Sequence, residues 1–315
     1  MGLGLLSERF KAVIMGHAVG DALGVPVEFC SREELDDKPI TKMIGFGTYP
    51  FPAGCWSDDT SMSLATLESL TQGEINYDDI MNNFIKWLDK GEFTPTGKAF
   101  DIGRTCLKAI MLYAQTKDIN TCGRASENSN GNGSLMRIHP MVLYLYTRDD
   151  LRLQEKMDII HTTSSLTHAH ERSQIGCGIY AFVLWELLDG ASKVTIFEGL
   201  KKAMEYYKDY AEFENYSRIF EEPFVDIPRN DISSSGYVVH TLEAALWCLL
   251  NSESYEECIL TAVNLGEDTD TVGAVAGGLA GALYGYDAIP DEWLDTLKKK
   301  DYIEDMCDRA EKSWF

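Results

Sequence analysis

The sequence predicts an all-α protein, and three observations lead to this class. Apolar residues recur at intervals of three and four over most of the chain, which is the periodicity of amphipathic helices. Stretches with the alternating pattern of a β-strand are few and short. No repeat, low-complexity tract or linker rich in Gly, Pro or Ser divides the chain. We therefore expect residues 1–315 to fold as a single helical domain.

The helices are predicted in order from the N-terminus. The first contains residues 10–22 at helical spacing and ends before Pro26, because proline removes a backbone donor. The second begins at Ser57, a residue favoured at helix N-caps, and continues to Leu70. The same periodicity predicts further helices in residues 77–88, 102–113, 172–188, 238–250, 255–265 and 271–284.

Glycine recurs at every fourth position on two of these helices. The positions are Gly16, Gly20 and Gly24 on the first helix and Gly273, Gly277 and Gly281 on the last. A glycine inside a helix costs ~1 kcal/mol relative to alanine, so three in register require compensation. We expect the two glycine faces to pack closely at the centre of the bundle. That contact would bring the acidic ends of the two helices together.

The composition is that of a globular protein with a strong acidic excess. Hydrophobic residues make up 45% and charged residues 25%, and 28 basic residues stand against 50 acidic ones, a net charge of −22. A field of this sign repels phosphate backbones, so we expect no stable binding to nucleic acid. A small anionic ligand would need metal ions or backbone N–H groups to offset the repulsion.

The cysteines and the N-terminal residues indicate a cytoplasmic protein. Eight cysteines are scattered without a C-x-x-C pair, which argues against a zinc site and against a disulfide framework. Charged residues from Glu8 to Lys11 come too early for a signal peptide. The most apolar run, residues 271–284, is shorter than the ~20 residues that span a bilayer. We expect no membrane segment.

Acidic residues gather in four places that the helical pattern tends to bury. They are Asp21 with Glu28, Asp58 with Asp59, Asp101, and Glu267 to Asp270. Taken alone, the pairs at helix starts also suit an N-terminus, where the helix dipole favours carboxylates. However, Asp21 lies inside an otherwise apolar helix, and Asp268 and Asp270 directly precede another. Because almost no Lys or Arg lies beside them, buried carboxylates at these positions call for bound cations.

The available donors indicate which cations would bind. Carboxylates together with the hydroxyls of Ser57 and Thr271 form an oxygen-only set, which favours Mg²⁺, Mn²⁺ or Ca²⁺ over zinc. The number of carboxylates suits two ions. A pair of metal ions typically orients a substrate and activates a water molecule.

Two stretches without periodicity are expected to be functional loops. Residues 124–134 are rich in Gly, Asn and Ser, and residues 210–235 are aromatic and acidic. The adjacent glycines of Gly131-Asn-Gly-Ser134 allow successive N–H groups to point at an anion, although a plain turn explains them equally well. No G-x-S-x-G, Walker A or G-x-G-x-x-G motif is present. Among the histidines, His168 in its polar run is the best candidate for a site residue.

Taken in order, the motifs resemble the ADP-ribosylglycohydrolase family, which includes dinitrogenase reductase activating glycohydrolase and the ADP-ribosylarginine and ADP-ribosylserine hydrolases. The similarity extends from about Phe10 to Gly285. Each motif is modest alone, but seven in the same order make a specific match. They are Gly20-Asp-Ala-Leu-Gly-Val-Pro-Val-Glu28, Trp56-Ser-Asp-Asp-Thr60, Phe100-Asp-Ile-Gly103, Gly131-Asn-Gly-Ser-Leu-Met-Arg137, Leu166-Thr-His168, Ser235-Gly-Tyr237 and Gly266-Glu-Asp-Thr-Asp-Thr271.

The resemblance implies an orthogonal all-α bundle with two Mg²⁺ or Mn²⁺ ions in a central cleft. Carried over motif by motif, Glu28 would lie at the cleft and reach a metal directly or through water. Asp101 matches a carboxylate proposed to transfer protons in the dinitrogenase-reductase branch, and Tyr237 matches an aromatic position suited to stacking on adenine. The other implied residues are the metal ligands Ser57, Asp58, Asp59, Asp268, Asp270 and Thr271, and the phosphate loop Asn132, Gly133 and Ser134, with His168 nearby.

Two positions depart from the family pattern. Ser57 stands where many members have Thr, which keeps the hydroxyl group. Glu267 stands where the family often has Gly. Its side chain would either crowd the metal loop or add an acid at the cleft.

The resemblance also implies the reaction. It is metal-dependent hydrolysis of the glycosidic bond between ADP-ribose and a modified side chain, with an ADP-ribosylated protein as substrate and ADP-ribose as product. Asp59 or Glu28 would direct a water molecule at the anomeric carbon, and Asp101 would assist ring opening or protonate the leaving group. Residues 100–103 resemble the dinitrogenase-reductase branch more than the serine-specific one, so arginine is the expected linkage.

Two other functions stay open at this point. A catalytically inactive relative that only binds ADP-ribose would lack metal acids, whereas Asp58, Asp59, Asp268 and Asp270 are all present. A two-metal phosphohydrolase acting on a nucleotide pyrophosphate would release phosphate or AMP in place of intact ADP-ribose.

Overall fold

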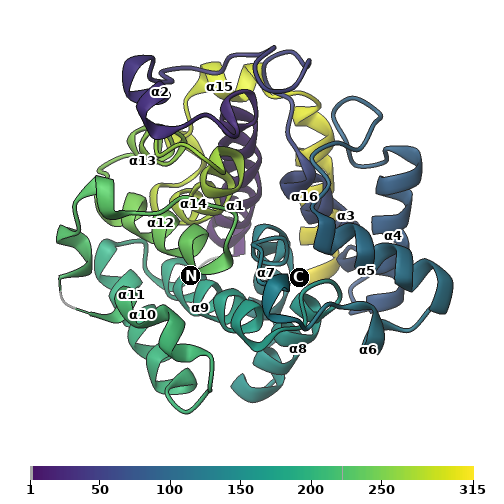
Figure 1. The fold of residues 1–315 in the computed structure, drawn as a ribbon. Helices are drawn as coiled ribbons and strands as arrows, with labels where there is room; N and C mark the ends of the chain where they lie inside the picture. Colours follow the sequence, from purple (N-terminus) through teal and green to yellow (C-terminus); the bar gives the residue numbers. More distant parts are fainter. Residues whose placement is uncertain (1–2, 222) are drawn as a thin grey trace.

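The computed structural model describes residues 3–221 and 223–315, and every regular element in that part of the chain is a helix (Figure 1). The predicted all-α class is confirmed. The α-helices are α1 (Leu3–Gly24), α2 (Arg32–Asp37), α3 (Asp58–Leu70), α4 (Tyr77–Lys90), α5 (Arg104–Thr116), α6 (Ile119–Cys122), α7 (His139–Tyr146), α8 (Leu153–Ser165), α9 (Glu171–Asp189), α10 (Lys193–Tyr207), α11 (Ser217–Phe220), α12 (Val238–Leu250), α13 (Tyr255–Val263), α14 (Thr269–Tyr284), α15 (Asp291–Thr296) and α16 (Lys300–Trp314). Short 3₁₀ turns lie between them: η1 (Val25–Val27), η2 (Glu127–Ser129), η3 (Leu135–Arg137), η4 (Phe213–Tyr216), η5 (Phe224–Asp226), η6 (Arg229–Asp231) and η7 (Tyr286–Ala288).

Helices α1 and α14 form the antiparallel pair at the centre of the fold. Their backbones touch along the predicted glycine faces, since a Cβ atom added at Gly20 would overlap the backbone oxygen of Gly273. A Cβ added at Gly16 would likewise overlap the oxygen of Gly277. The expectation of a close glycine contact is confirmed. Only residues without a side chain let two helix axes approach this closely.

The direction of this pair decides where the acids lie. Because the helices are antiparallel, the C-terminal end of α1 meets the N-terminal end of α14, and the Thr269 hydroxyl donates a hydrogen bond to the Gly24 carbonyl over 2.8 Å. Asp21 and Glu28 therefore come from one side of the contact and Asp270 from the other. The surrounding helices run in several directions: α9, α12 and α13 pack on α14, and α3, α7 and α16 pack on α1 (Figure 1).

The predicted helices all form, with ends that differ by a few residues, except that α1 begins at Leu3. The sequence pattern did not predict α7, α8, α10 and α16. Helix α7 is buried on nearly all sides, so it has no polar face to create a period. The outer helices bury only a narrow stripe, such as Ile303, Met306 and Ala310 on α16. The segment 210–235 contains only short turns and one-turn helices in its described residues, as expected for a loop.

Helix α1 is long and apolar enough to span a bilayer by composition alone. It is almost entirely buried among the other helices, which is the position of a core helix (Figure 1). Its apolar surface is therefore already covered by protein, and the helix gives no indication of a membrane location.

The glycine contact yields a stability prediction. Gly20→Ala places a methyl group against the backbone of α14, which cannot move as a flexible side chain would, so we expect the free energy of unfolding to fall by about 3 kcal/mol. Gly4→Ala on the same helix is the matched control, because its Cβ meets no atom, and it should be neutral or stabilising by up to ~1 kcal/mol. Denaturant unfolding measures both. Equal stability of Gly20→Ala and wild type would contradict the close contact.

Candidate active site

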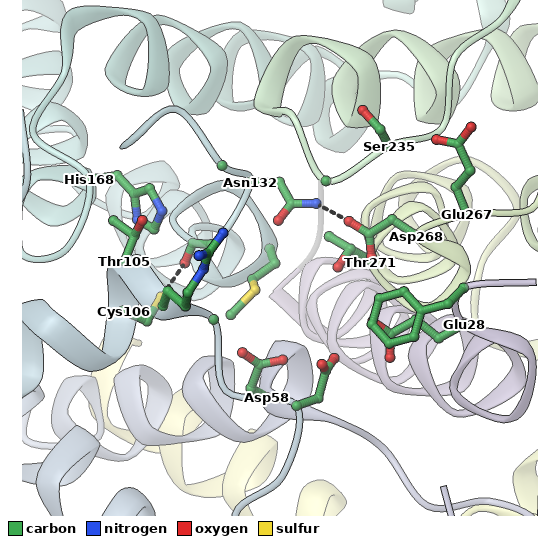
Figure 2. Close-up of a pocket in the computed structure, with 18 of the residues that line it drawn as sticks. Glu28, Asp58, Thr105, Cys106, Asn132, His168, Ser235, Glu267, Asp268 and Thr271 are labelled. Carbon is green, nitrogen blue, oxygen red and sulfur yellow. Dashed lines mark hydrogen bonds between the residues drawn. The ribbon is translucent and has the colours of Figure 1, made fainter. Parts of the chain in front are cut away.

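A cavity of about 590 Å³ opens where the ends of α1, α3, α5 and α14 meet the loop after α6. Two of its walls differ in chemistry (Figure 2). We call one the acidic wall, which consists of Glu28, Glu267 and Asp268. We call the other the donor wall, which consists of Arg104, Thr105, Gly133 and His168. Asp58 and Thr271 also line the cavity.

The N-terminus of α3 is held by an acid from another helix. Asp21 on α1 accepts hydrogen bonds from the Ser57 and Thr60 backbone N–H groups, over 2.9 and 3.0 Å, and from the Thr60 hydroxyl over 2.6 Å. The Ser57 hydroxyl caps the helix by accepting from the Asp59 N–H over 3.3 Å. The carboxylates of Asp58 and Asp59 are therefore not needed as caps. The sequence alone left that alternative open.

The α3 and α14 termini share a network of short polar contacts. One Asp59 oxygen, Oδ2, accepts from the Ser57 hydroxyl over 2.9 Å and from the Thr271 hydroxyl over 3.3 Å. On α14, Asp270 Oδ1 accepts from the Thr271 N–H over 2.9 Å. The side chain of Asp268 accepts from the Asn132 amide over 2.6 Å. The network joins the acidic motifs with the predicted phosphate loop.

Several carboxylate oxygens in this network are buried without a hydrogen-bond partner. They are Glu28 Oε2, Asp59 Oδ1 and Asp270 Oδ2. Oxygens from Asp21, Asp59 and Asp270 lie within 4.8 Å of one another, and so do oxygens from Glu28, Asp101 and Asp270. Buried anionic oxygens that converge without a donor suit divalent cations. Since both Asp21 oxygens already accept hydrogen bonds, Asp21 acts mainly as the support of α3.

Burial changes the protonation of these acids in the absence of a counter-charge. It raises the pKa of Asp21 to about 7. Burial together with the charge of Asp101 raises the pKa of Glu28 to about 9. The pKa values of Asp59 and Asp270 are raised well above the usual range, again mainly because the groups are buried. The protein alone therefore does not stabilise the fully ionised form of these carboxylates.

Asp101 lies at the edge of the cavity, half-buried, with a left-handed backbone (φ 53°). The Tyr49 hydroxyl donates to its carboxylate over 2.8 Å. Helix α5 begins only at Arg104, and its N-cap residue, Gly103, makes no side-chain cap. The simpler interpretation, that Asp101 caps the helix predicted from residue 102, is therefore wrong. Its carboxylate remains available at the cavity.

Two backbone hydrogen bonds join the predicted phosphate loop to the segment before α12. The Asn132 N–H donates to Gly236 O and the Val238 N–H donates to Asn130 O, both over 3.0 Å. Within the part of the chain that the structure describes, the N–H groups of Gly133 and Ser134 donate no hydrogen bond. A Cβ at Gly133 would overlap His168 and Cys106, so only glycine fits there.

Side chains of the loop region differ from the expectation in their orientation. The Ser134 hydroxyl is buried and accepts from the Ser164 hydroxyl over 2.9 Å, so it points into the core and not into the cavity. His168 lines the cavity, and burial lowers its pKa to about 3, which keeps the ring neutral. Its Nδ1 shares a hydrogen bond with the Thr167 hydroxyl over 2.9 Å.

Tyr237 lies beside the cavity and is not part of its lining, although Ser235 and Gly236 are. Its ring packs edge-on against His240 at 4.9 Å, and the Arg172 guanidinium lies 5.8 Å above it. Arg172 is itself held by ion pairs to Glu127 and Glu212. The structure therefore brings Tyr237 near the phosphate loop without placing its ring in the cavity wall.

Sequence reasoning missed three features of the site. The support of α3 by Asp21 was not predicted, although an acid inside an apolar helix was a visible signal. The contact of Tyr49 with Asp101 joins residues far apart in the sequence and left no local pattern. Phe29 lines the cavity with an exposed ring, and nothing in its sequence surroundings indicated this.

The family model and the similar proteins all belong to one group, the ADP-ribosyl hydrolases. The family model described as ADP-ribosylglycohydrolase matches residues 4–314. The chain is 34% identical to ADP-ribosylarginine hydrolase Tri1 of Pseudomonas putida over 96% of its own length and 79% of that protein. It is 31% identical to ADP-ribosyl-[dinitrogen reductase] glycohydrolase of Rhodospirillum rubrum, over 93% and 91% of the two chains.

A solved structure titled ADP-ribosylglycohydrolase-related protein complex is also similar. It superimposes with a TM-score of 0.82 at 32% identity and covers 98% of this chain and 99% of its own. The family model spans nearly the whole chain and includes every motif of the site. The chain belongs to the ADP-ribosylglycohydrolase family.

Proposed function

We propose that this chain is a cytoplasmic, two-metal hydrolase that cleaves the N-glycosidic bond between ADP-ribose and an arginine side chain of a modified protein. One observation carries the proposal most directly. Carboxylate oxygens of Glu28, Asp59 and Asp270 are buried without a hydrogen-bond partner, and Asp270 belongs to two clusters of close carboxylate oxygens, one with Asp59 and one with Glu28, next to a cavity that Glu28 and Thr271 line. Such oxygens require cations, and the cavity beside them is large enough for a nucleotide-sized ligand.

The donor set fits two Mg²⁺ or Mn²⁺ ions, because it contains only hydroxyl and carboxylate oxygens. The proposed ligands are Ser57, Asp58, Asp59, Asp268, Asp270 and Thr271, with Glu28 close to them. When bound, such ions supply a water of lowered pKa and fix the hydroxyls of the ribose.

The chain's own residues would carry the proton transfers. Asp59 or Glu28 would orient the attacking water, since both have an oxygen without a partner, Glu28 lines the cavity and Asp59 contacts the cavity-lining Thr271. A guanidine leaves readily only when it is protonated or when the ribose ring opens first. Asp101, whose carboxylate is held by the Tyr49 hydroxyl at the cavity edge, would transfer that proton.

The nucleotide half of the substrate would occupy the donor wall. The Gly133 N–H lines the cavity and is free to donate to an anion, the Ser134 N–H follows it in the chain, and the neutral ring of His168 lies beside Gly133. A diphosphate placed there avoids the acidic wall. Tyr237 would stack on adenine, with the ring turned from its present packing toward the ligand.

Three observations support arginine as the linkage. One relative is named an ADP-ribosylarginine hydrolase, and residues 100–103 resemble the dinitrogenase-reductase branch. The acidic wall also suits a cationic leaving group. An ADP-ribosylated protein is therefore the proposed partner and ADP-ribose the proposed product.

The metal requirement predicts a loss of both activity and stability on chelation. Removing divalent ions should abolish release of ADP-ribose and lower the melting temperature, because ligands that bind only the folded state stabilise it. Mg²⁺ or Mn²⁺ should restore both. Asp58→Ala and Asp270→Ala should remain folded and lose activity, whereas Asp37→Ala on the exposed end of α2 is a control without effect. Full turnover after verified metal removal would refute the two-metal site. Release of AMP in place of ADP-ribose would indicate a phosphohydrolase.

The buried acids predict an unusual pH dependence for the metal-free protein. Asp21 and Glu28 keep their protons when folded at pH values where the unfolded chain has lost them. Their contribution to stability is complete below their unfolded pKa near 4 and is lost as the pH rises through about 7 for Asp21 and about 9 for Glu28. The melting temperature should thus fall between about pH 5 and about pH 9 in chelator, and stabilisation by Mg²⁺ should grow over the same range. A rise in melting temperature would contradict these assignments.

Asp101→Asn tests the proton-transfer role. The amide oxygen can still accept from Tyr49, so the variant should fold and bind ADP-ribose like wild type while turnover falls by ~10²-fold. Tyr49→Phe is the companion variant and should lower turnover less, since it removes only the supporting hydrogen bond. Hydrolysis of an ADP-ribosyl-arginine peptide is measured beside calorimetric binding of ADP-ribose. Wild-type turnover by Asp101→Asn would remove Asp101 from the mechanism.

A further inference from the structure

Two residues at the edge of the cavity hold a left-handed backbone although neither is glycine. Phe29 has φ 68° and Glu267 has φ 61°. Their segments are tied together by two hydrogen bonds, from Phe29 N–H to Glu267 O over 2.7 Å and from Glu267 N–H to Cys30 O over 2.8 Å. Side chains other than glycine are disfavoured in this conformation and persist there when the surroundings enforce it. The arrangement fixes both side chains at one place.

Both side chains line the cavity and neither is used for packing within the fold. The Phe29 ring is 70% exposed. The Glu267 carboxylate is exposed and forms no ion pair or hydrogen bond in the described residues. The Arg32 guanidinium donates to the carbonyls of Leu265, Arg229 and Ile232 and makes no ion pair with Glu267. An aromatic ring and a carboxylate without a partner in the described residues thus both line the cavity, on backbone segments that are hydrogen-bonded to each other.

The position of Phe29 and Glu267 within the cavity indicates the charge of the ligand group that would lie beside them. Glu267 shares the acidic wall with Glu28 and Asp268 (Figure 2). The donor-wall residues His168 and Thr105 lie on the other side of the same view. Arg104 and Gly133, whose N–H donates no hydrogen bond in the described residues, also line the cavity. Because Asp268 and Glu28 are assigned to the metal ions, Glu267 is the acid of this wall that stays uncompensated in the metal-loaded enzyme. A ligand with an anionic and a cationic end is therefore expected to place its anionic end on the donor wall and its cationic end beside Glu267.

We propose that Phe29 and Glu267 form the subsite for the guanidinium side chain of the substrate. The inference rests on the proposed function, and it names the residues that would select an arginine-linked over a neutral leaving group. A guanidinium is planar, so it can lie on the Phe29 ring while its N–H groups donate to the Glu267 carboxylate. Neither residue takes part in the proton transfers assigned above.

The test compares the two halves of the substrate in the full, metal-loaded enzyme. KM and kcat are measured with an ADP-ribosyl-arginine peptide at low ionic strength, and the inhibition constant of ADP-ribose reports on the nucleotide half alone. The variants are Glu267→Gln and Phe29→Leu. Phe46→Leu is the matched control, because Phe46 is 74% exposed, also has a left-handed backbone (φ 56°), and does not line the cavity.

We expect Glu267→Gln to raise KM about five-fold and Phe29→Leu about three-fold, the range for exposed charge and cation–π contacts. The value of kcat and the inhibition constant of ADP-ribose should stay within two-fold, and Phe46→Leu should change nothing. The effect of Glu267→Gln should shrink at 0.5 M salt, since screening weakens an exposed ion pair.

Glu267→Gly separates recognition from a merely structural role. Glycine adopts φ 61° freely and keeps both backbone hydrogen bonds, so the melting temperature should not fall, while KM should rise as it does for Glu267→Gln. An unchanged KM in Glu267→Gln and Glu267→Gly, with wild type cleaving the arginine peptide, overturns the subsite alone. An equal rise in the ADP-ribose inhibition constant overturns it as well, because the residues would then contact the nucleotide. A wild-type enzyme that does not cleave the arginine peptide overturns the proposed linkage and this subsite together.

Discussion

The backbone contact between α1 and α14 positions most of the site. Glycines on both helices remove the side chains that would hold the axes apart, and the antiparallel direction places the end of α1 against the start of α14. Asp21 then reaches the start of α3 and fixes it through three hydrogen bonds. One contact between two helices thereby sets the relative positions of acids from three segments of the chain. A shift of this pair would move every proposed metal ligand at once.

The buried carboxylates of the site are electrostatically unfavourable in the protein alone. Carboxylates that are buried near one another shift their pKa values upward, and Glu28, Asp59 and Asp270 each retain an oxygen without a partner. In an ordinary core such groups would be replaced by apolar ones, because unpaired buried charge is strongly destabilising. Their presence next to a cavity, with the hydroxyls of Ser57 and Thr271 on Asp59, is explained when cations complete the site.

Much of the fold and the position of the acidic motifs could be predicted from the sequence, because both depend on local patterns. Helical periodicity identified α1, α3 and α14, and the glycine spacing indicated their close contact. The sequence could not predict how individual side chains of the site are oriented. Ser134 turns into the core because Ser164, thirty residues away, offers a donor there. Tyr237 packs against His240 and Arg172 beside the cavity, and the left-handed backbone of Glu267 depends on its pairing with residue 30. These features come from tertiary contacts that leave no periodic signal.

A protein with a net charge of −22 must still attract a nucleotide in the proposed function. The separation of the two walls makes this possible, since His168 lies away from Glu28 and Asp268 in Figure 2, and Gly133, whose N–H donates no hydrogen bond in the described residues, packs against His168. Cations at the buried carboxylates would remove the largest local source of repulsion between the acidic floor and a diphosphate. Metal binding and nucleotide binding would then be coupled through charge. In the proposed complex, an acid that remains uncompensated at the cavity, such as Glu267, would face the end of the substrate that carries positive charge.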